Sequence, residues 1–223
     1  MPAPTVVFDL DGTLVDTAPD LVHAANHVLA RAGFGPVPGE VLRPFISFGS
    51  RRMIVEGLAH HGGVLPDGEI DAMWQAFLRH YADNIAVDSR PYPHIQRQLT
   101  QLAERGSRLA VCTNKVEGLS RQLLSTLGLL DHFGAVCGRD TFAVCKPHPD
   151  HLIATIRAAG GDPANTIMVG DSDTDVATAR AAGVPIIGVT FGYTEIPMRD
   201  LCPDVVIDDY SALDDAIARC RVV

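Results

Sequence analysis

The chain has 223 residues, of which 47% are hydrophobic and 20% charged, a composition that can bury a core and excludes a disordered tail or a fibrous repeat. Acidic residues outnumber Lys and Arg by 27 to 18, and the net charge of -9 argues against nucleic acid as a partner. The sequence contains no run of about 18 apolar residues, no secretory signal and no C-x-x-C pair, so we expect a cytoplasmic protein with reduced thiols and no membrane partner.

The predicted elements begin with a buried strand at Thr5–Phe8. The next strand-like run, Leu109–Cys112, lies much farther along the chain than one crossover helix requires, which indicates an insertion. Within this insertion, apolar residues recur at helical spacing only. The last apolar stripe of the insertion consists of Ile70, Met73, Trp74, Phe77, Leu78 and Tyr81. We expect Asp16 or Thr17 to cap the first of these helices.

Strand and helix patterns then alternate to the C-terminus. The strand-like runs are Leu109–Cys112, Ala135–Cys137, Ile167–Val169, Ile186–Val189 and Val205–Ile207. Three helical segments are followed by a glycine at the position just past a helix end: Gly106, Gly128 and Gly160. The alternation predicts an α/β fold, a doubly wound parallel sheet formed by residues 1–14 and 87–223, with a helical cap domain inserted at residues 15–86.

The strongest chemical signal is the segment FDLDGTLVDT at the end of the first strand. Asp9 and Asp11 stand two residues apart where the strand opens into a loop, so their carboxylates can point to the same side. Ligands bind at the carboxyl ends of strands in such sheets, and like charges this close need a cation or a proton between them. The alternative, a solvated Asp-Gly turn, needs only one of the two aspartates.

A second acidic group occurs in VGDSDTDVATARAAG, where a strand-like run leads into Asp171, Ser172, Asp173 and Asp175 ahead of a helix. Mg2+ prefers oxygen ligands and is commonly held by one or two carboxylates together with a substrate phosphate. Acidic residues before a helix can instead serve only as caps. Together with the first motif, the group favours a Mg2+ site.

Two further segments, LAVCTNK and CKPHPD, offer donors for phosphoryl oxygens. The first ends a strand in Thr113, Asn114 and Lys115, and the second places Lys146 before a helix. Hydroxyl, backbone N–H and ammonium groups stabilise the charge of a transferring phosphoryl group. Polar strand ends and solvated lysines are common, but these two lysines are the only ones among 18 Lys and Arg residues. A lysine is a compact point charge that fits between carboxylates and a phosphate.

The motifs follow one another in a defined order: D-x-D-G-T after the first strand, a Thr after the second, a Lys, and G-D-S-x-x-D after a later strand. In this order they resemble the haloacid dehalogenase superfamily, and within it the chain is most similar to the phosphoglycolate phosphatases. That similarity lies in FDLDGTLVDTAPDL, YPHIQRQL, LAVCTNK, CKPHPDHL, VGDSDTDVATARAAG and PDVVID. The resemblance implies a Rossmann-like core, an inserted cap and Mg2+-dependent hydrolysis of a phosphoric monoester.

The resemblance also implies roles for individual residues. Asp9 would be the nucleophile that becomes an aspartyl phosphate. Asp11 would act first as the acid that protonates the leaving group and then as the base that activates water. Asp9, the main-chain carbonyl of Asp11, and Asp171 would hold Mg2+.

The other implied roles concern the phosphoryl group. Thr113 and the backbone of Asn114 would bind it, and Lys146 would offset negative charge beside the nucleophile. Asp175, together with Ser172, would stand behind these groups and orient Lys146 or a metal-bound water.

In this family the cap selects the leaving group. Dehalogenases lack the second aspartate of the first motif, whereas phosphonate hydrolases and the mutases with a similar cap use a cap lysine, which residues 15–86 do not contain. The segment FGSRRMI is expected to reach the site, with Arg51 binding the carboxylate of 2-phosphoglycolate. Ser47 departs from the family, which usually has a glycine there.

The predicted reaction is the hydrolysis of a small phosphate monoester, 2-phosphoglycolate, to glycolate and phosphate through an aspartyl phosphate. One alternative is a phosphatase or mutase of the same family that acts on a sugar phosphate or pyrophosphate. A more remote alternative is a non-catalytic binding module, against which the presence of both Asp9 and Asp11 argues. The sequence does not indicate an oligomeric state.

Overall fold

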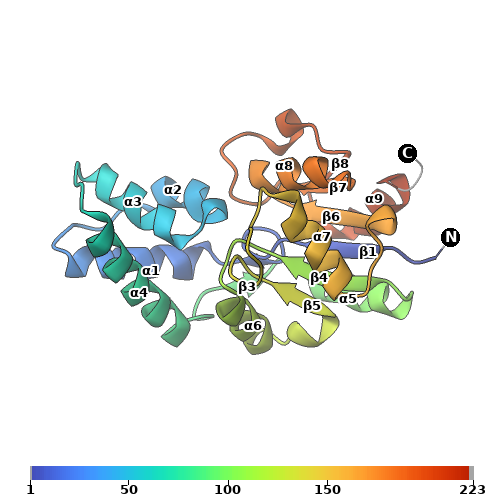
Figure 1. Cartoon of the computed structure of the whole chain (residues 1–223), viewed down its shortest axis with the longest axis horizontal. Coiled ribbons are helices and arrows are strands. Elements are labelled where there is room, and N and C mark those ends of the chain that lie inside the picture. Colours follow the sequence, from blue (N-terminus) through green and yellow to red (C-terminus); the bar gives the residue numbers. More distant parts are fainter. Residues whose placement is uncertain (1, 221–223) are drawn as a thin grey trace.

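A six-stranded parallel sheet forms the centre of the α/β part of the chain in the computed structural model, which describes residues 2–220 (Figure 1). In order across the sheet the strands are β5 (Ala135–Cys137), β4 (Arg108–Cys112), β1 (Thr5–Phe8), β6 (Thr166–Gly170), β7 (Ile186–Val189) and β8 (Val205–Ile207). Every neighbouring pair is parallel. The predicted strands and the doubly wound fold class are confirmed.

Helices cover both faces of the sheet, because alternate residues of a strand point to opposite sides. Val6 and Phe8 of β1 belong to one apolar cluster, and Val7 belongs to another. The first cluster includes residues of α5 (Ile95–Glu104), α6 (Glu117–Thr126) and α9 (Leu213–Cys220), and the second includes residues of α7 (Pro149–Ala158) and α8 (Asp173–Ala182). The glycines expected past three helix ends have left-handed φ angles of 83°, 68° and 70°: Gly106, Gly128 and Gly160.

The inserted segment folds into α1 (Ala18–Arg31), α3 (Ser50–His60) and α4 (Asp67–Asp83), beside the sheet in Figure 1. Their buried side chains continue the apolar cluster that packs on β1. Two elements were not predicted, α2 (Gly39–Leu42) and a 3-10 helix at Arg43–Phe48. Each buries one residue, Leu42 and Ile46, so no helical period is readable there. Within residues 2–220, no helix is both long and apolar enough to cross a membrane.

The chain passes between the two parts at a short antiparallel pair, β2 (Val15–Asp16) with β3 (Arg90–Pro91). The expectation that the insertion contains only helices is therefore wrong, because strands of two residues leave no readable pattern. Asp20 holds the returning chain: its Oδ2 accepts hydrogen bonds from the Ser89 backbone N at 2.8 Å and from Ser89 Oγ at 2.6 Å. The exact cap limits at residues 15 and 86 stay a prediction.

The first cap helix begins at Thr17, but not through a side-chain cap of its own. Thr17 Oγ1 donates to Asp11 Oδ1 at 2.7 Å. The Tyr193 hydroxyl instead accepts from the backbone N atoms of Thr17 and Ala18, at 2.7 and 2.9 Å, and donates to Asp16 Oδ1 at 2.6 Å. Thr17 thus occupies the predicted N-cap position of α1, but neither Asp16 nor Thr17 caps the helix with its side chain, because the distant Tyr193 hydroxyl satisfies the helix N-terminus.

Candidate active site

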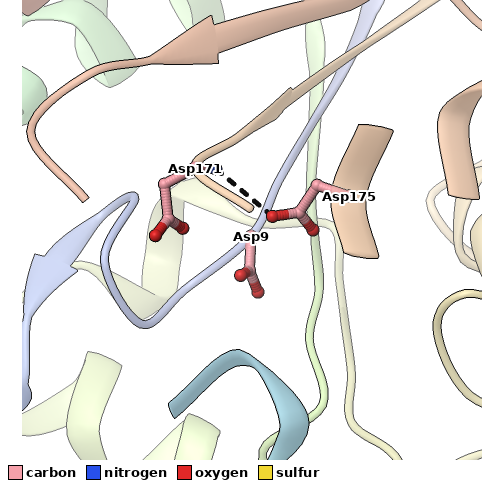
Figure 2. A group of neighbouring side chains, drawn as sticks. All are labelled: Asp9, Asp171 and Asp175. Atoms are coloured by element: carbon pink, nitrogen blue, oxygen red, sulfur yellow. Dashed lines mark hydrogen bonds between the residues drawn. The ribbon is translucent and has the colours of Figure 1, made fainter. Parts of the chain in front are cut away.

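Three carboxylates meet at the carboxyl edge of the sheet (Figure 2). Asp9 follows β1, Asp171 follows the neighbouring β6, and Asp175 lies in the first turn of α8. One ligand oxygen from each lies within 4.8 Å of the others, and all three residues are buried. Burial raises the pKa of Asp9 to about 7 against the influence of Lys146, and burial and Asp175 raise the pKa of Asp171 well above its ordinary value. This acidic cluster of buried oxygens fits a divalent cation.

Hydrogen bonds fix the second acidic segment. Asp171 accepts from Thr13 Oγ1 at 2.7 Å and from the backbone N of Tyr193 at 2.9 Å. Asp175 Oδ2 accepts from Ser172 Oγ at 2.6 Å, and the two residues form a capping box at the start of α8. The capping interpretation thus applies to Ser172 and Asp175, and Asp175 also belongs to the acidic cluster.

Lys146 brings a buried cation to the acidic cluster. Its Nζ lies 2.9 Å from Asp9 Oδ1 and 2.6 Å from Asp175 Oδ1. Burial lowers the pKa of Lys146, but Asp175 and Asp9 outweigh burial and raise it, so the ammonium is charged. Apart from this ion pair, Asp9 Oδ1 has no hydrogen-bond partner within residues 2–220. A buried carboxylate oxygen in this state is available to an incoming phosphorus atom or a metal ion.

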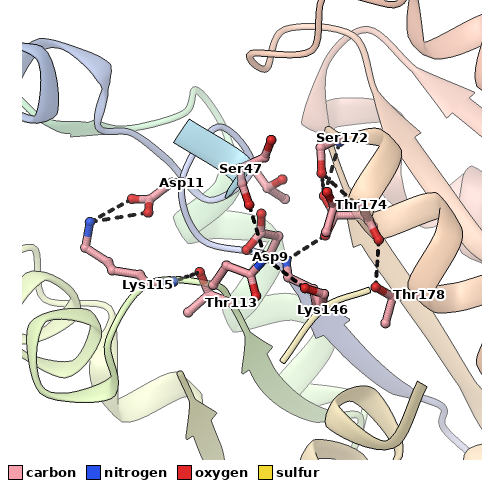
Figure 3. A network of polar contacts seen from close by, with 12 residues as sticks. Asp9, Asp11, Ser47, Thr113, Lys115, Lys146, Ser172, Thr174 and Thr178 are labelled. Atoms are coloured by element: carbon pink, nitrogen blue, oxygen red, sulfur yellow. Dashed lines mark hydrogen bonds and ion pairs between the residues drawn. The ribbon is translucent and has the colours of Figure 1, made fainter. Parts of the chain in front are cut away.

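Thr113 and Asn114 follow β4 and bring polar groups to the same edge, where Figure 3 shows Thr113. Thr113 is buried, and its Oγ1 accepts from the backbone N of Lys115 at 3.2 Å. Asn114 Nδ2 donates to the main-chain oxygens of Ser47 and Lys146, at 3.1 and 3.2 Å. Asn114 therefore joins the cap to the Lys146 loop, and Ser47 takes part through a backbone atom that a glycine would also supply.

The Asp11 carboxylate lies apart from the acidic cluster, beside Lys115 (Figure 3). Lys115 Nζ donates to its two oxygens at 3.0 and 3.3 Å. A small cavity lies next to this pair, between the cap and the core. Trp74 and Tyr81 of α4 line it from the cap, and Arg139 lines it from the core.

Arg51 does not line this cavity. Its Nη2 and Nε donate to Asp67 and Asp71 of α4, at 2.9 and 2.8 Å, on the exposed surface of the cap. The predicted contact with the substrate is therefore not supported, because two carboxylates hold the guanidinium elsewhere. Gly49 does line the cavity, and a Cβ on it would lie 2.8 Å from Arg139 Nη1.

Two charged cavity residues had no role in the predicted site: Arg139, and Lys115, which was predicted only as a donor for phosphoryl oxygens. Both follow a strand at the carboxyl edge of the sheet, β4 and β5 respectively, and Lys115 is one of only two lysines. The position after a strand could have identified Arg139 as a candidate, as it did Lys115. Tyr193, which binds Asp171 and the start of α1, lies in an irregular loop after β7 and carries no comparable signal.

Residues 6–189 match the haloacid dehalogenase-like hydrolase family, and the chain belongs to this family. It is 49% identical to a phosphoglycolate phosphatase of Agrobacterium fabrum, across 96% of this chain and 92% of that protein. It is 46% identical to a phosphoglycolate phosphatase of Mesorhizobium japonicum, across 98% and 96%. A crystal structure described as a predicted phosphoglycolate phosphatase from Haemophilus somnus superimposes with a TM-score of 0.89 and 28% identity, covering 96% and 97%. The chain is a phosphoric monoester hydrolase similar to these proteins.

Proposed function

We propose that this phosphatase hydrolyses 2-phosphoglycolate to glycolate and phosphate through an aspartyl phosphate on Asp9, with Mg2+ as its cofactor. The observation that carries the proposal is the buried Asp9 carboxylate at the strand end, 2.9 Å from the Lys146 ammonium and within the acidic cluster. The relatives named phosphoglycolate phosphatase, which match the chain over nearly its whole length, support the choice of substrate.

The acidic cluster fits Mg2+ by its chemistry, because all its donors are oxygens and two of its carboxyl pKa values are raised without a metal. Asp9, Asp171 and the main-chain carbonyl of Asp11 would hold the ion. When bound, Mg2+ supplies positive charge that offsets these carboxylates and the substrate phosphate. Asp175 is engaged with Lys146 and the start of α8, so we assign it the positioning of Lys146.

The chemistry on this chain begins when a carboxylate oxygen of Asp9 attacks phosphorus. The new O–P bond forms as the ester P–O bond breaks, and the leaving alkoxide takes a proton from Asp11. Water then gives a proton to Asp11 and attacks the phosphoryl group, which releases phosphate and restores Asp9. The Thr113 hydroxyl, the Asn114 backbone N–H and the Lys146 ammonium would stabilise the charge on the phosphoryl oxygens.

The test is detection of the phospho-enzyme. Asp9→Asn removes the nucleophile, so turnover should fall by several orders of magnitude and no phosphoryl adduct should form. Asp11→Asn should keep the attack and slow the second step, so mass spectrometry should show an adduct on Asp9. The exposed Asp131→Asn serves as the matched control and should behave as the wild type.

A covalent mechanism at Asp9 is refuted if Asp9→Asn keeps more than about a tenth of the wild-type kcat. The substrate is decided separately, by ranking kcat/KM over a panel of phosphate esters. A sugar phosphate or pyrophosphate that exceeds 2-phosphoglycolate would replace the substrate and leave the mechanism unchanged.

A further inference from the structure

Lys115 places a buried cation on the cavity between cap and core, away from the acidic cluster. Its Nζ lies 3.0 Å from Asp11 Oδ1 and 2.9 Å from the Tyr81 hydroxyl, and 4.3 Å from the centre of the Tyr81 ring. Burial lowers the pKa of Lys115, but Asp11 and Tyr81 raise it overall, so the ammonium stays charged. This is the second lysine of the chain, and no step proposed above uses it.

The contacts of Lys115 leave room for a ligand. An ammonium group has three N–H donors. Within residues 2–220 its side-chain acceptors are the two oxygens of Asp11, at 3.0 and 3.3 Å, and the Tyr81 hydroxyl, at 2.9 Å. Burial raises the pKa of Tyr81 to about 12, so this hydroxyl is neutral and does not cancel the charge. The longest of the three contacts, to Asp11 Oδ2 at 3.3 Å, is the one that a group entering the cavity would replace.

The cavity has an unbalanced charge. Its charged lining residues are Asp11, Lys115 and Arg139, which leaves one net positive charge. Arg139 forms no ion pair with any carboxylate of the described chain, and its Nη1 lies beside Gly49. The rest of the lining is apolar or neutral, with aromatic rings from α4. A single small anion would balance such a cavity.

We propose that Lys115 binds an anionic group on the leaving alcohol, and so selects phosphate esters that carry a carboxylate close to the ester oxygen. The proposal rests on the proposed function and adds the residue that reads its substrate. The ester oxygen must lie near Asp11, which protonates it, and Lys115 Nζ is only 3.0 Å from Asp11 Oδ1. In glycolate the carboxyl carbon is two bonds from that oxygen, so the carboxylate would lie within reach of Lys115.

The experiment compares two substrates that differ only in this group, 2-phosphoglycolate and 2-hydroxyethyl phosphate. The wild type should prefer the carboxylate by at least about tenfold in kcat/KM, as expected for one charge-assisted hydrogen bond. Lys115→Met should remove most of that preference. Arg105→Gln, an exposed cation that pairs with Asp214 on the surface, should keep it.

A binding measurement covers the case in which Lys115→Met disturbs Asp11. Titration calorimetry with 3-phosphonopropionate and 3-hydroxypropylphosphonate, which cannot be hydrolysed, measures the same preference without chemistry. The second variant combines Lys115→Met with Asp11→Asn. It removes both members of the ion pair, so neither side chain is left as an unpaired buried charge.

The outcomes separate the two proposals. A wild-type preference that persists in both Lys115 variants would overturn the assignment of Lys115 while leaving the substrate intact. Equal losses on both ligands would show that Lys115 serves only Asp11, and would also overturn it. Absence of any preference in the wild type would refute 2-phosphoglycolate as the substrate, whereas the phospho-enzyme on Asp9 would be unaffected.

Discussion

The buried acidic cluster predicts that the metal-free enzyme becomes less stable as pH rises. Burial raises the pKa of Asp9 from 3.8 to about 7, so between these values the folded chain holds a proton that the unfolded chain has released. Stability is therefore present at low pH and is lost as pH rises through this window. The shift in Asp9 corresponds to roughly 4 kcal/mol, because each unit of pKa represents about 1.36 kcal/mol. For a chain of this size the loss would lower Tm by roughly 8 to 16 °C.

The assay is thermal unfolding of EDTA-treated protein between about pH 5 and pH 8, a range that covers about two of the roughly three pKa units of the shift and hence roughly 2.7 kcal/mol of the loss. Asp9→Asn cannot titrate at this position, so the difference between the wild-type and variant curves isolates the contribution of Asp9. Asp171, whose pKa is also raised, adds a loss of the same sign in both proteins, and the part of its raised pKa that the Asp9 charge causes counts within the contribution of Asp9. Mg2+ competes with these protons, so it should stabilise the wild type strongly near pH 8 and weakly near pH 5. At a hundredfold excess over its Kd the gain is about 2.7 kcal/mol.

Two results would refute this reasoning. Parallel pH curves for the wild type and Asp9→Asn would mean that the Asp9 carboxylate carries no burial cost. A rise in Tm with Mg2+ that is equal at both ends of the pH range would mean that the ion binds away from the acidic cluster.

Two further predictions concern residues that support the site. Tyr193→Phe leaves the backbone N–H groups of Thr17 and Ala18 without their acceptor and should cost about 1 to 3 kcal/mol in urea unfolding; an unchanged midpoint would contradict this role. Gly12→Ala places a Cβ against the Asp171 carboxylate at a φ of 85°, so the Mg2+ concentration for half-maximal activity should rise at least about tenfold. Gly68→Ala, which has open space around it, is the control, and equal Mg2+ requirements in both variants would exclude the steric explanation.

The sheet was predictable because its strands are buried on both faces. Such strands appear in the sequence as short, continuous apolar runs, and Thr5–Phe8 and Ile186–Val189 have the same limits in the structure. The short elements at the junction with the cap were not predictable, because tertiary contacts define them. The pairing of Val15–Asp16 with Arg90–Pro91 brings together segments far apart in the sequence.

The core residues of the site were also predictable from the sequence, whereas the cap residues were not. Asp9, Thr113 and Asp171 each follow a strand, so the order of motifs along a parallel sheet indicates which side chains share an edge. The cap residues do not follow from such a rule, since a helical stripe shows which face is apolar but not which core residue it meets. Arg51 illustrates this limit, because only the packing of α3 against α4 reveals that Asp67 and Asp71 engage it.

The acidic cluster and the cavity lie apart, and Tyr193 and Asp11 connect them to the start of α1. Tyr193 binds Asp171 through its backbone and the start of α1 through its hydroxyl, so one residue links the first cap helix to a proposed metal ligand. Asp11 accepts from Thr17 at the same helix start and from Lys115 at the cavity. From the two proposals we therefore expect substitutions around the cavity to change the substrate, and substitutions at either connecting residue to affect both substrate choice and catalysis.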